Sequence, residues 1–317
     1  MKHLYVMDPL EVIQVNGDST YMLMLEANKR GWETFWCTPT DLFAEDGKAF
    51  GVVQKVQVSD REPHFVSESK EERFLGDFQV VWMRKDPPFD MDYIFSTYLL
   101  DLIPKTTLVL NDPKSIRNCN EKMFALQFPQ FSPKTLVTRE IQRARQWAAQ
   151  FDKVVIKPWD GNGGRGVLVT SFEDPNFRSM VEILTSNQSQ YILVQQYIPE
   201  IKNGDKRIIL VDGEAVGQIL RVPQKGDHRG NIHVGARVEK CELTDREREI
   251  CACLGPVLKE LRLLFVGIDT IGDRLTEINV TSPTGIQEIN SLLGIQVEKI
   301  LSDQILCYYE RDCAQDQ

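Results

Sequence analysis

In the first 119 residues, short apolar runs typical of strands alternate with segments whose apolar residues have helical spacing. An apolar run at 4–7 is followed by helical spacing over 19–30, and a second apolar run lies at 32–38. This β-α-β order predicts a parallel pair of strands, because parallel strands need a crossover connection. The pattern therefore predicts an open, parallel α/β domain over residues 1–119. Its other expected elements are a hairpin within 42–58, strands at 78–83 and 107–110, and helices at 93–102 and 116–128.

From residue 120 onward the chain carries hairpin signals. Asp212-Gly213 separates two apolar runs, which is a strong signal of a two-residue turn. The segment 223–238 is polar, basic, rich in glycine and without periodicity, and such length is typical of a lid or a binding loop. We expect strands at 134–138, 154–158, 167–170, 191–198, 208–211 and 215–222, and helices at 141–151, at 244–263 with Thr244 as cap, and at 297–309.

Composition and charge narrow the class of protein. The 317 residues include 37 Lys and Arg against 46 Asp and Glu, a net charge of −9, so we expect no nucleic-acid partner. The chain has no apolar run of about twenty residues, and its first residues do not read as a signal peptide, so we expect no membrane partner. The seven cysteines are scattered without zinc-site spacing, which predicts reduced thiols and a cytoplasmic protein.

A predicted hairpin over 266–283 has a polar face on otherwise apolar strands. Glu277 and Asn279 are two residues apart, so both point to the same side of their strand. Carboxylate and amide oxygens of this kind hold hard cations such as Mg²⁺. The stretch therefore predicts a metal site that Asp269 of the facing strand would complete; the alternative is an exposed hairpin with ordinary surface carboxylates.

The length of the turn decides whether Asp269 joins this face. A two-residue loop of Gly272 and Asp273 would place Asp269 opposite Thr276, on the wrong side. A three-residue loop that also includes Arg274 would place it opposite Glu277. We favour the three-residue loop.

A glycine-rich string at 160–166 follows the strand that contains Lys157. It includes a G-x-G-x-x-G pattern, but a strand follows it, so it lacks the helix N-terminus of a dinucleotide-binding fingerprint. Glycines let backbone N–H groups turn toward an anion, and a lysine in an apolar strand is costly without an anionic partner. With Arg165 in the loop, the pattern predicts a phosphate-binding hairpin; the alternative is a flexible surface turn.

Three polar loops follow predicted strand ends of the first domain, at 8–18, 84–86 and 111–113. Ligands of open α/β sheets bind beyond the carboxyl ends of the strands. Arg84 and Lys85 could therefore hold a substrate carboxylate; the alternative is that they cap a helix or face solvent.

Phosphoryl transfer requires above all that the phosphates are positioned and their charge is stabilised. The predicted lysines and backbone N–H groups can bind phosphates, and the predicted hairpin can bind the metal ion that bridges them. In this order they resemble the ATP-grasp superfamily and, more closely, the bacterial glutathione synthetases, over nearly the whole chain. The residues that carry the resemblance are 7–9 (MDP), 83–90 (MRKDPPFD), 118–122 (NCNEK), 157–158 (KP) with the glycine string, 205–207 (DKR), 211–214 (VDGE) and, most specifically, 272–283 (GDRLTEINVTSP).

The resemblance implies a fold and a reaction. The α/β domain would bind substrate and precede an ATP-grasp fold of two α+β lobes, a small lobe at 120–200 and a large lobe at 201–317 with the lid at 223–238. The reaction would join γ-glutamylcysteine and glycine into glutathione, through an acyl phosphate formed from ATP. A homotetramer that uses Mg²⁺ or Mn²⁺ is implied as well.

The resemblance also implies residue roles. Contacts with ATP would come from Lys122, Lys157, Gly161, Gly163, Gly164, Gly166, Gln195, Gln196, Tyr197, Ile198 and, at the ribose, Asp205. The metal would be held by Asp269, Glu277 and Asn279. Catalysis would involve Arg207, Arg221 and the lid residue Arg229, and the peptide would contact Asp18, Arg84 and Ser282. Two other functions stay open: a related carboxylate–amine ligase with another substrate, and a non-catalytic ATP-binding module.

Overall fold

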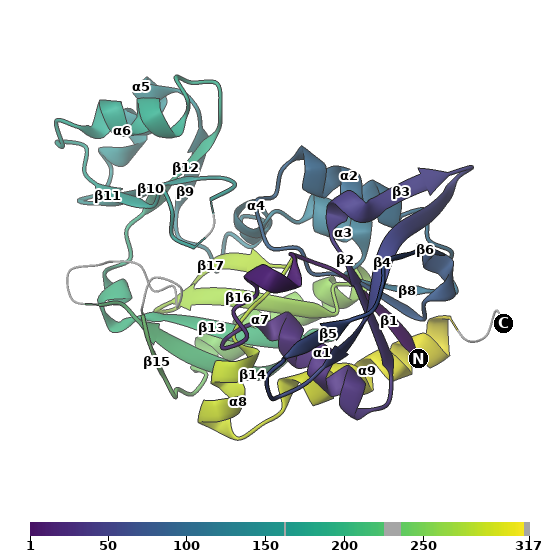
Figure 1. The fold of residues 1–317 in the computed structure, drawn as a ribbon. Coiled ribbons are helices and arrows are strands. Elements are labelled where there is room, and N and C mark those ends of the chain that lie inside the picture. Colours follow the sequence, from purple (N-terminus) through teal and green to yellow (C-terminus); the bar gives the residue numbers. More distant parts are fainter. Residues whose placement is uncertain (162, 225–235, 314–317) are drawn as a thin grey trace.

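The computed structural model describes residues 1–161, 163–224 and 236–313. The chain forms three sheets in succession, with eight, four and five strands, and helices pack on each of them (Figure 1). The predicted order, an α/β domain followed by two α+β lobes, is confirmed. All seven cysteines are described, and no disulfide joins any of them. No described helix is long and apolar enough to cross a membrane.

Parallel strands form the centre of the first sheet. β1 (Lys2–Val6) lies between β2 (Glu33–Cys37) and β7 (Val80–Met83), and β8 (Leu108–Leu110) pairs with β7. The predicted β-α-β unit is confirmed, since α1 (Ser19–Lys29) connects β1 to β2. The remaining elements are the antiparallel strands β3 (Leu42–Glu45), β4 (Lys48–Val58), β5 (Phe65–Ser67) and β6 (Glu71–Phe74), the helix α2 (Met91–Leu100) and 3-10 turns at Leu10–Val12, Pro39–Asp41 and Leu75–Asp77.

The second sheet forms a small lobe that stands apart from the rest of the molecule (Figure 1). Its strand order is β11-β10-β12-β9, and every pair is antiparallel. The β10–β11 pairing confirms that the glycine string is a hairpin loop and not the start of a helix. The elements are β9 (Thr135–Thr138), α5 (Ile141–Ala148), β10 (Val154–Pro158), β11 (Leu168–Thr170), α6 (Phe177–Leu184) and β12 (Ile192–Gln196), followed by a 3-10 turn at Pro199–Asn203.

The third sheet is the base of the large lobe, in the order β15-β14-β13-β16-β17. Asp212 and Gly213 form the predicted two-residue turn, and both have positive φ, 49° and 73°. Thr244 caps the following helix, as predicted, by accepting from the N–H of Glu247. The elements are β13 (Asp205–Val211), β14 (Glu214–Val222), β15 (Arg237–Glu239), α7 (Asp245–Glu260), β16 (Phe265–Ile271), β17 (Arg274–Asn279) and α8 (Ile286–Leu293).

The single helix predicted over 116–128 is wrong. The chain instead forms α3 (Pro113–Asn118) and α4 (Glu121–Ala125). The side chain of Asn120 accepts from the N–H groups of Lys122 and Met123, at 3.2 and 3.1 Å, and so starts a new helix. Apolar spacing continues across the break, which is why periodicity did not reveal it. The break brings Lys122 into the first turn of α4.

The β16–β17 hairpin has the predicted pairing but a different turn. Its loop consists of Gly272 and Asp273 alone, so the predicted three-residue loop is wrong. The ladder then shifts by one residue, and this β-bulge puts Asp269 opposite Glu277. Thr276 is the extra residue, and its hydroxyl donates to the carbonyl of Asp269 at 3.0 Å. The extra residue in the bulge therefore has the same effect on the pairing of Asp269 as the third loop residue that was predicted.

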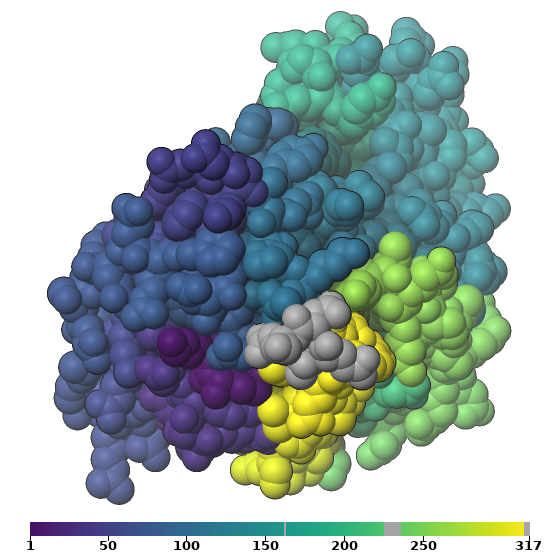
Figure 2. All heavy atoms as spheres, turned by 90° about the vertical axis from the view of Figure 1, so that its right-hand side faces the viewer, coloured from purple at the N-terminus to yellow at the C-terminus, as the bar shows by residue number. Residues whose placement is uncertain are grey.

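The C-terminal helix α9 (Val297–Asp312) joins the first and third sheets. Leu301 and Ile305 belong to one apolar core with Tyr5 of the first sheet and Val211 of the third. Figure 2 shows this helix in yellow between the purple N-terminal part and the green part of the large lobe. The N-terminal and large-lobe elements therefore share a core, which holds the two walls of the site in place.

Asn111, just after β8, makes a second link between these parts. Its side-chain amide donates to the carbonyls of Phe265 and Val280, each at 2.8 Å, and its carbonyl oxygen accepts from the N–H of Phe265 at 3.0 Å. The three partners are buried backbone groups, so removing the amide would leave them without hydrogen bonds.

We expect Asn111→Ala to lower the free energy of unfolding by about 2–4 kcal/mol, because it strands buried polar groups. Urea unfolding followed by far-UV circular dichroism measures the change. Asn118→Ala, at an exposed position, is the matched control and should cost far less. Equal stability of the two variants would contradict a structural role for the Asn111 bridge.

Candidate functional site

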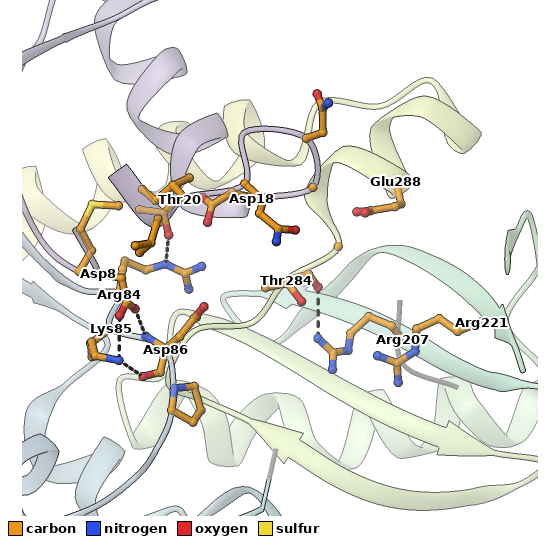
Figure 3. Close-up of a pocket in the computed structure, with 18 residues that line it drawn as sticks. Asp8, Asp18, Thr20, Arg84, Lys85, Asp86, Arg207, Arg221, Thr284 and Glu288 are labelled. Carbon is orange, nitrogen blue, oxygen red and sulfur yellow. Dashed lines mark hydrogen bonds and ion pairs between the residues drawn. The ribbon is translucent and has the colours of Figure 1, made fainter. Parts of the chain in front are cut away.

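A cavity of about 550 Å³ opens at the carboxyl ends of β1 and β7 and extends to the third sheet (Figure 3). Ligands of open α/β sheets bind at such strand ends. Its walls come from segments far apart in the sequence, and their polar members include Asp18, Thr20, Arg84, Arg207, Arg221, Thr284 and Glu288.

Arg84 lies at the end of β7 with only 3% of its surface exposed. Its Nε donates to Thr20 Oγ1 and its Nη2 to the carbonyl of Pro283, each at 3.1 Å. Its Nη1 is buried without a hydrogen-bond partner. Burial lowers the pKa of Arg84, although Asp86 and Asp18 partly offset this. An anchored guanidinium with a free donor in a cavity suits a substrate carboxylate.

The other residues predicted to contact substrate differ in availability. Asp18 lines the cavity but also caps α1 by accepting from the N–H of Tyr21 at 2.6 Å, and burial raises its pKa. Lys85 forms an ion pair with Asp8 at 3.0 Å. Ser282 does not line the cavity; its hydroxyl donates to the carbonyl of Arg84 at 3.3 Å, beneath the site.

Asp269 is the centre of a buried ion cluster. Arg207 donates to both of its oxygens, at 2.5 and 2.9 Å, and Arg221 lies 3.1 Å from Oδ1. Burial alone would raise the pKa of Asp269, but the two guanidinium groups outweigh it and hold that pKa well below its usual range. Arg221 also pairs with both oxygens of Asp205. Two of the three predicted catalytic arginines, the predicted ribose ligand and one predicted metal ligand therefore meet in one network.

Glu277 faces two buried lysines. Its Oε1 lies 3.6 Å from Nζ of Lys122 and 3.8 Å from Nζ of Lys157. Burial lowers the pKa of Lys157. Burial also acts against the charge of Lys122, but Glu277 and Glu121 outweigh it and raise its pKa. Two lysines from separate elements, α4 and β10, thus converge on a carboxylate of the hairpin.

Gly161 of the glycine string lies beside one of these lysines. The carbonyl of Gly161 accepts from Nζ of Lys122 at 2.5 Å. Gly163, Gly164 and Gly166 have φ of 60°, 75° and 72°, a conformation in which L side chains are strained. The loop can therefore present backbone N–H groups beside the two lysines, as a phosphate-binding loop requires.

The end of β12 offers fewer free backbone groups than its sequence suggests. The N–H of Gln196 donates to the backbone carbonyl of Lys134 at 2.9 Å, and the N–H of Tyr197 donates to the backbone carbonyl of Lys153 at 3.2 Å. The side-chain amide of Gln195 donates to Thr135 at 2.9 Å. Within the described part of the chain, the N–H of Ile198 has no such partner. It is the donor that this strand end leaves for a base.

The donor set of the hairpin fits a hard divalent cation. Asp269, Glu277 and Asn279 lie on one face, and Asn279 donates through Nδ2 to the carbonyl of Gly267 at 3.2 Å, which directs its Oδ1 elsewhere. Two carboxylates and an amide oxygen are suitable ligands for such a cation when phosphate and water complete its shell. The described residues contain no group of three or more His, Cys, Asp or Glu that could hold a metal alone, so phosphate oxygens would have to contribute.

Some residues of the site were not identified from the sequence. Glu121 contacts Lys122, and Thr284 and Glu288 line the cavity. Glu288 lies in the first turn of α8, five residues after the string that carries the metal ligands, and that proximity was the available signal. Arg229 and positions 225–235 of the predicted lid lie outside the described residues, and residues 237–238 belong to β15 rather than to a loop.

We expect Asp269→Asn to destabilise the protein by about 3–5 kcal/mol, because it leaves two buried guanidinium groups without their shared anion. Thermal and urea unfolding at neutral pH measure the loss. Since the pKa of Asp269 is lowered in the fold, its stabilisation is complete at neutral pH and is lost only as the pH falls through the folded pKa. Wild-type stability of this variant at pH 7 would contradict the ion cluster.

Comparisons with known proteins agree with this geometry. The family model for the N-terminal domain of prokaryotic glutathione synthetase matches residues 1–117, and the model for its ATP-grasp domain matches residues 121–294. The curated glutathione synthetase of Agrobacterium fabrum is 45% identical over 300 residues, which cover 94% of each chain. That of Bradyrhizobium diazoefficiens is 46% identical over 301 residues, covering 94% of this chain and 96% of the relative.

Solved structures share the fold at low identity. D-cycloserine synthetase has a TM-score of 0.66 at 13% identity, with 96% of this chain and all of that chain (100%) covered. D-alanyl-alanine synthetase A from Vibrio cholerae has a TM-score of 0.62 at 12% identity, with 98% and 99% covered. These likenesses show the fold alone, whereas the family models and the curated relatives show the family, over nearly the whole chain. The chain belongs to the prokaryotic glutathione synthetase family of ATP-grasp proteins and is an ATP-dependent ligase of glutathione biosynthesis.

Proposed function

We propose that the cavity and the hairpin together join γ-glutamylcysteine to glycine at the expense of ATP. The observation that carries this assignment is the convergence on Glu277 of Lys122 and Lys157, two buried lysines from separate elements, α4 and β10. Isolated buried charges are costly, so such a group of cations suits the phosphates of ATP. The peptide would lie in the adjoining cavity, where Arg84 offers a free donor.

Each residue has a part in positioning the reactants. Lys122, Lys157 and the glycine loop hold the phosphates, and Arg207 and Arg221 hold the reacting carboxylate and the phosphoryl group that it receives. The carboxylate oxygen attacks the γ-phosphorus and ADP leaves; the glycine amine then attacks the acyl carbon and phosphate leaves. Arg84 and Asp18 bind the peptide, and Ser282 supports Arg84 from below.

Asp269, Glu277 and Asn279 are proposed to hold Mg²⁺, with Mn²⁺ as an alternative. A bound divalent cation would neutralise phosphate charge and orient the γ-phosphoryl group. In the described structure Oδ1 of Asp269 contacts Arg207 and Arg221, and Oδ2 contacts Arg207 and Asn279. A carboxylate has about four lone-pair sites, so a cation at Asp269 would take the place of one of these contacts.

The nucleoside is assigned to the strand end between the two lobes. We propose that Gln195, Gln196, Tyr197 and Ile198 border the adenine, with the N–H of Ile198 as a donor. Asp205 would accept the ribose hydroxyls on lone pairs that Arg221 does not use. The segment 223–238, with Arg229, is proposed to cover the site, because water would hydrolyse the acyl phosphate.

The domain roles and the setting are proposals as well. Residues 1–119 would bind the peptide, and residues 120–200 and 201–317 would form the two lobes that enclose ATP. A cytoplasmic location is supported by the absence of disulfides among the seven cysteines. The expected homotetramer is supported by an apolar stripe along α2 and the turn that follows it, where Met91, Phe95, Tyr98 and, two residues after the helix, Leu102 are 59%, 61%, 51% and 40% exposed. Their spacing of three and four residues puts them on one helix face, as in helix pairs between subunits.

We expect Glu277→Gln to lower kcat by roughly a hundredfold or more, since it replaces a charged ligand of the proposed metal with a neutral one. The assay measures phosphate release and glutathione formation with ATP, Mg²⁺, γ-glutamylcysteine and glycine. Asp273→Asn removes an exposed carboxylate from the same hairpin and should retain wild-type turnover. Undiminished activity of Glu277→Gln would contradict the assignment of the hairpin.

We expect Phe95→Asp to convert the protein to a smaller species, because a charge in an apolar subunit contact is not compensated. Light scattering coupled to gel filtration gives the mass directly. Phe172→Asp, on the small lobe with 39% exposure, is the control and should keep the wild-type mass. An unchanged mass for Phe95→Asp would exclude α2 as the subunit contact.

A further inference from the structure

Glu121 is a partly buried acid that the proposed function does not use. It is the first residue of α4, and its carboxylate contacts Nζ of its neighbour Lys122. Only 18% of the Glu121 side chain is exposed. Burial and the charge of Glu277 raise the pKa of Glu121, although Lys122 opposes them. A second carboxylate in a site for phosphates repels those phosphates, so its presence requires an explanation.

The contact between Glu121 and Lys122 is local. Both residues lie in the first turn of α4, where sequence neighbours normally point away from each other. An ion pair that supports tertiary structure joins separate elements, as the pair of Arg207 and Asp269 joins β13 to β16. The pair in α4 joins no such elements, so its effect is on the ammonium group of Lys122 itself.

The ammonium group of Lys122 is already occupied by protein oxygens. An ammonium has three N–H donors. Nζ of Lys122 donates to the carboxylate of Glu121 and to the carbonyl of Gly161, the latter at 2.5 Å, and it lies 3.6 Å from Oε1 of Glu277. A phosphate that binds this lysine therefore competes with Glu121 for its charge.

Lys157 lies beside the same hairpin carboxylate without such a close anion. In the described part of the chain, Glu277 is the only ion-pair partner of Lys157, at 3.8 Å. Both lysine side chains are almost fully buried, 2% and 7% exposed, so burial does not explain the difference. Glu121 is what distinguishes the surroundings of Lys122 from those of Lys157.

A small cavity beside Glu121 gives its carboxylate a place to turn. The cavity has a volume of about 20 Å³ and is lined by Glu121 together with Phe89, Asp160 and Thr281 among others. That volume is enough for about one water molecule, which can hydrate a displaced carboxylate. The side-chain amide of Asn120 ties the start of α4 to the carbonyl of Trp159 at 3.4 Å. The Glu121 side chain can therefore turn while the helix stays in place.

We propose that Glu121 is a positioning residue, the internal counter-ion that holds Nζ of Lys122 in the site until a nucleotide phosphate takes its place. This proposal rests on the proposed assignment of Lys122 to the phosphates of ATP. Glu121 keeps the buried ammonium paired while the site is empty. Because a phosphate must displace this carboxylate, Glu121 lowers the affinity for the nucleotide.

The test is the affinity of Glu121→Gln, which keeps the shape of the side chain and removes its charge, for adenylyl imidodiphosphate with Mg²⁺. Isothermal titration calorimetry gives the Kd. We expect the Kd to fall at least about fivefold relative to the wild type, because the phosphates no longer displace or approach an anion. The Kd for adenosine, which has no phosphate, should stay within about twofold. Glu173→Gln, an exposed acid of the small lobe, is the matched control for net charge and should change neither value.

A crystal structure of the wild-type protein with the same analogue tests the exchange without any substitution. The proposal predicts a phosphate oxygen in contact with Nζ of Lys122 and the Glu121 carboxylate turned away from it. A structure in which Glu121 keeps its contact with Nζ while the phosphates are bound would overturn the proposal.

The affinities can overturn it as well. A smaller fall than about fivefold, an unchanged Kd or a rise for Glu121→Gln would show that Glu121 does not compete with the phosphates. An equal gain for adenosine would show an effect on the nucleoside instead. These outcomes differ from a failure of the proposed function, in which the wild-type protein itself would neither bind the ATP analogue nor form glutathione.

Discussion

Buried positive charge is the constraint on which the arrangement of the site depends. Lys122, Lys157, Arg207 and Arg221 come from different segments, and each is almost fully buried. One hairpin supplies anions to all of them: Asp269 to the arginines and Glu277 to the lysines. Because the β-bulge puts these two carboxylates opposite each other, the register of β16 and β17 brings the two cation groups together.

The two groups of cations differ in what they leave for a ligand. The arginines contact Asp269 at hydrogen-bond distances, whereas the lysines remain more than 3.5 Å from Glu277. Close pairing suits a structural network, and loose pairing suits a site that exchanges its anion for phosphate. Lys122 also pairs closely with Glu121, so Lys157 is the lysine whose charge this hairpin leaves most available to ATP.

Much of the fold follows from periodicity and turn residues, since the β-α-β start, the Asp212-Gly213 turn and the Thr244 cap all appear as predicted. The helix break at Asn120 and the bulge at Thr276 do not follow from periodicity, because apolar spacing continues through the first and the second depends on pairing between strands. Asp269, Glu277 and Asn279 could be grouped from sequence on one hairpin. The partners of Asp269 could not, because Arg207 and Arg221 reach it through the neighbouring strands β13 and β14. Glu288 could not be singled out either, since its place in the cavity wall is a property of three-dimensional packing.

The most direct test of the central claim is a crystal structure of the protein with ADP and Mg²⁺. The account predicts a cation about 2.0–2.1 Å from oxygens of Glu277 and Asn279, with the phosphates in contact with Nζ of Lys122 and Lys157. A cation held elsewhere, or nucleotide phosphates bound away from these lysines, would contradict it.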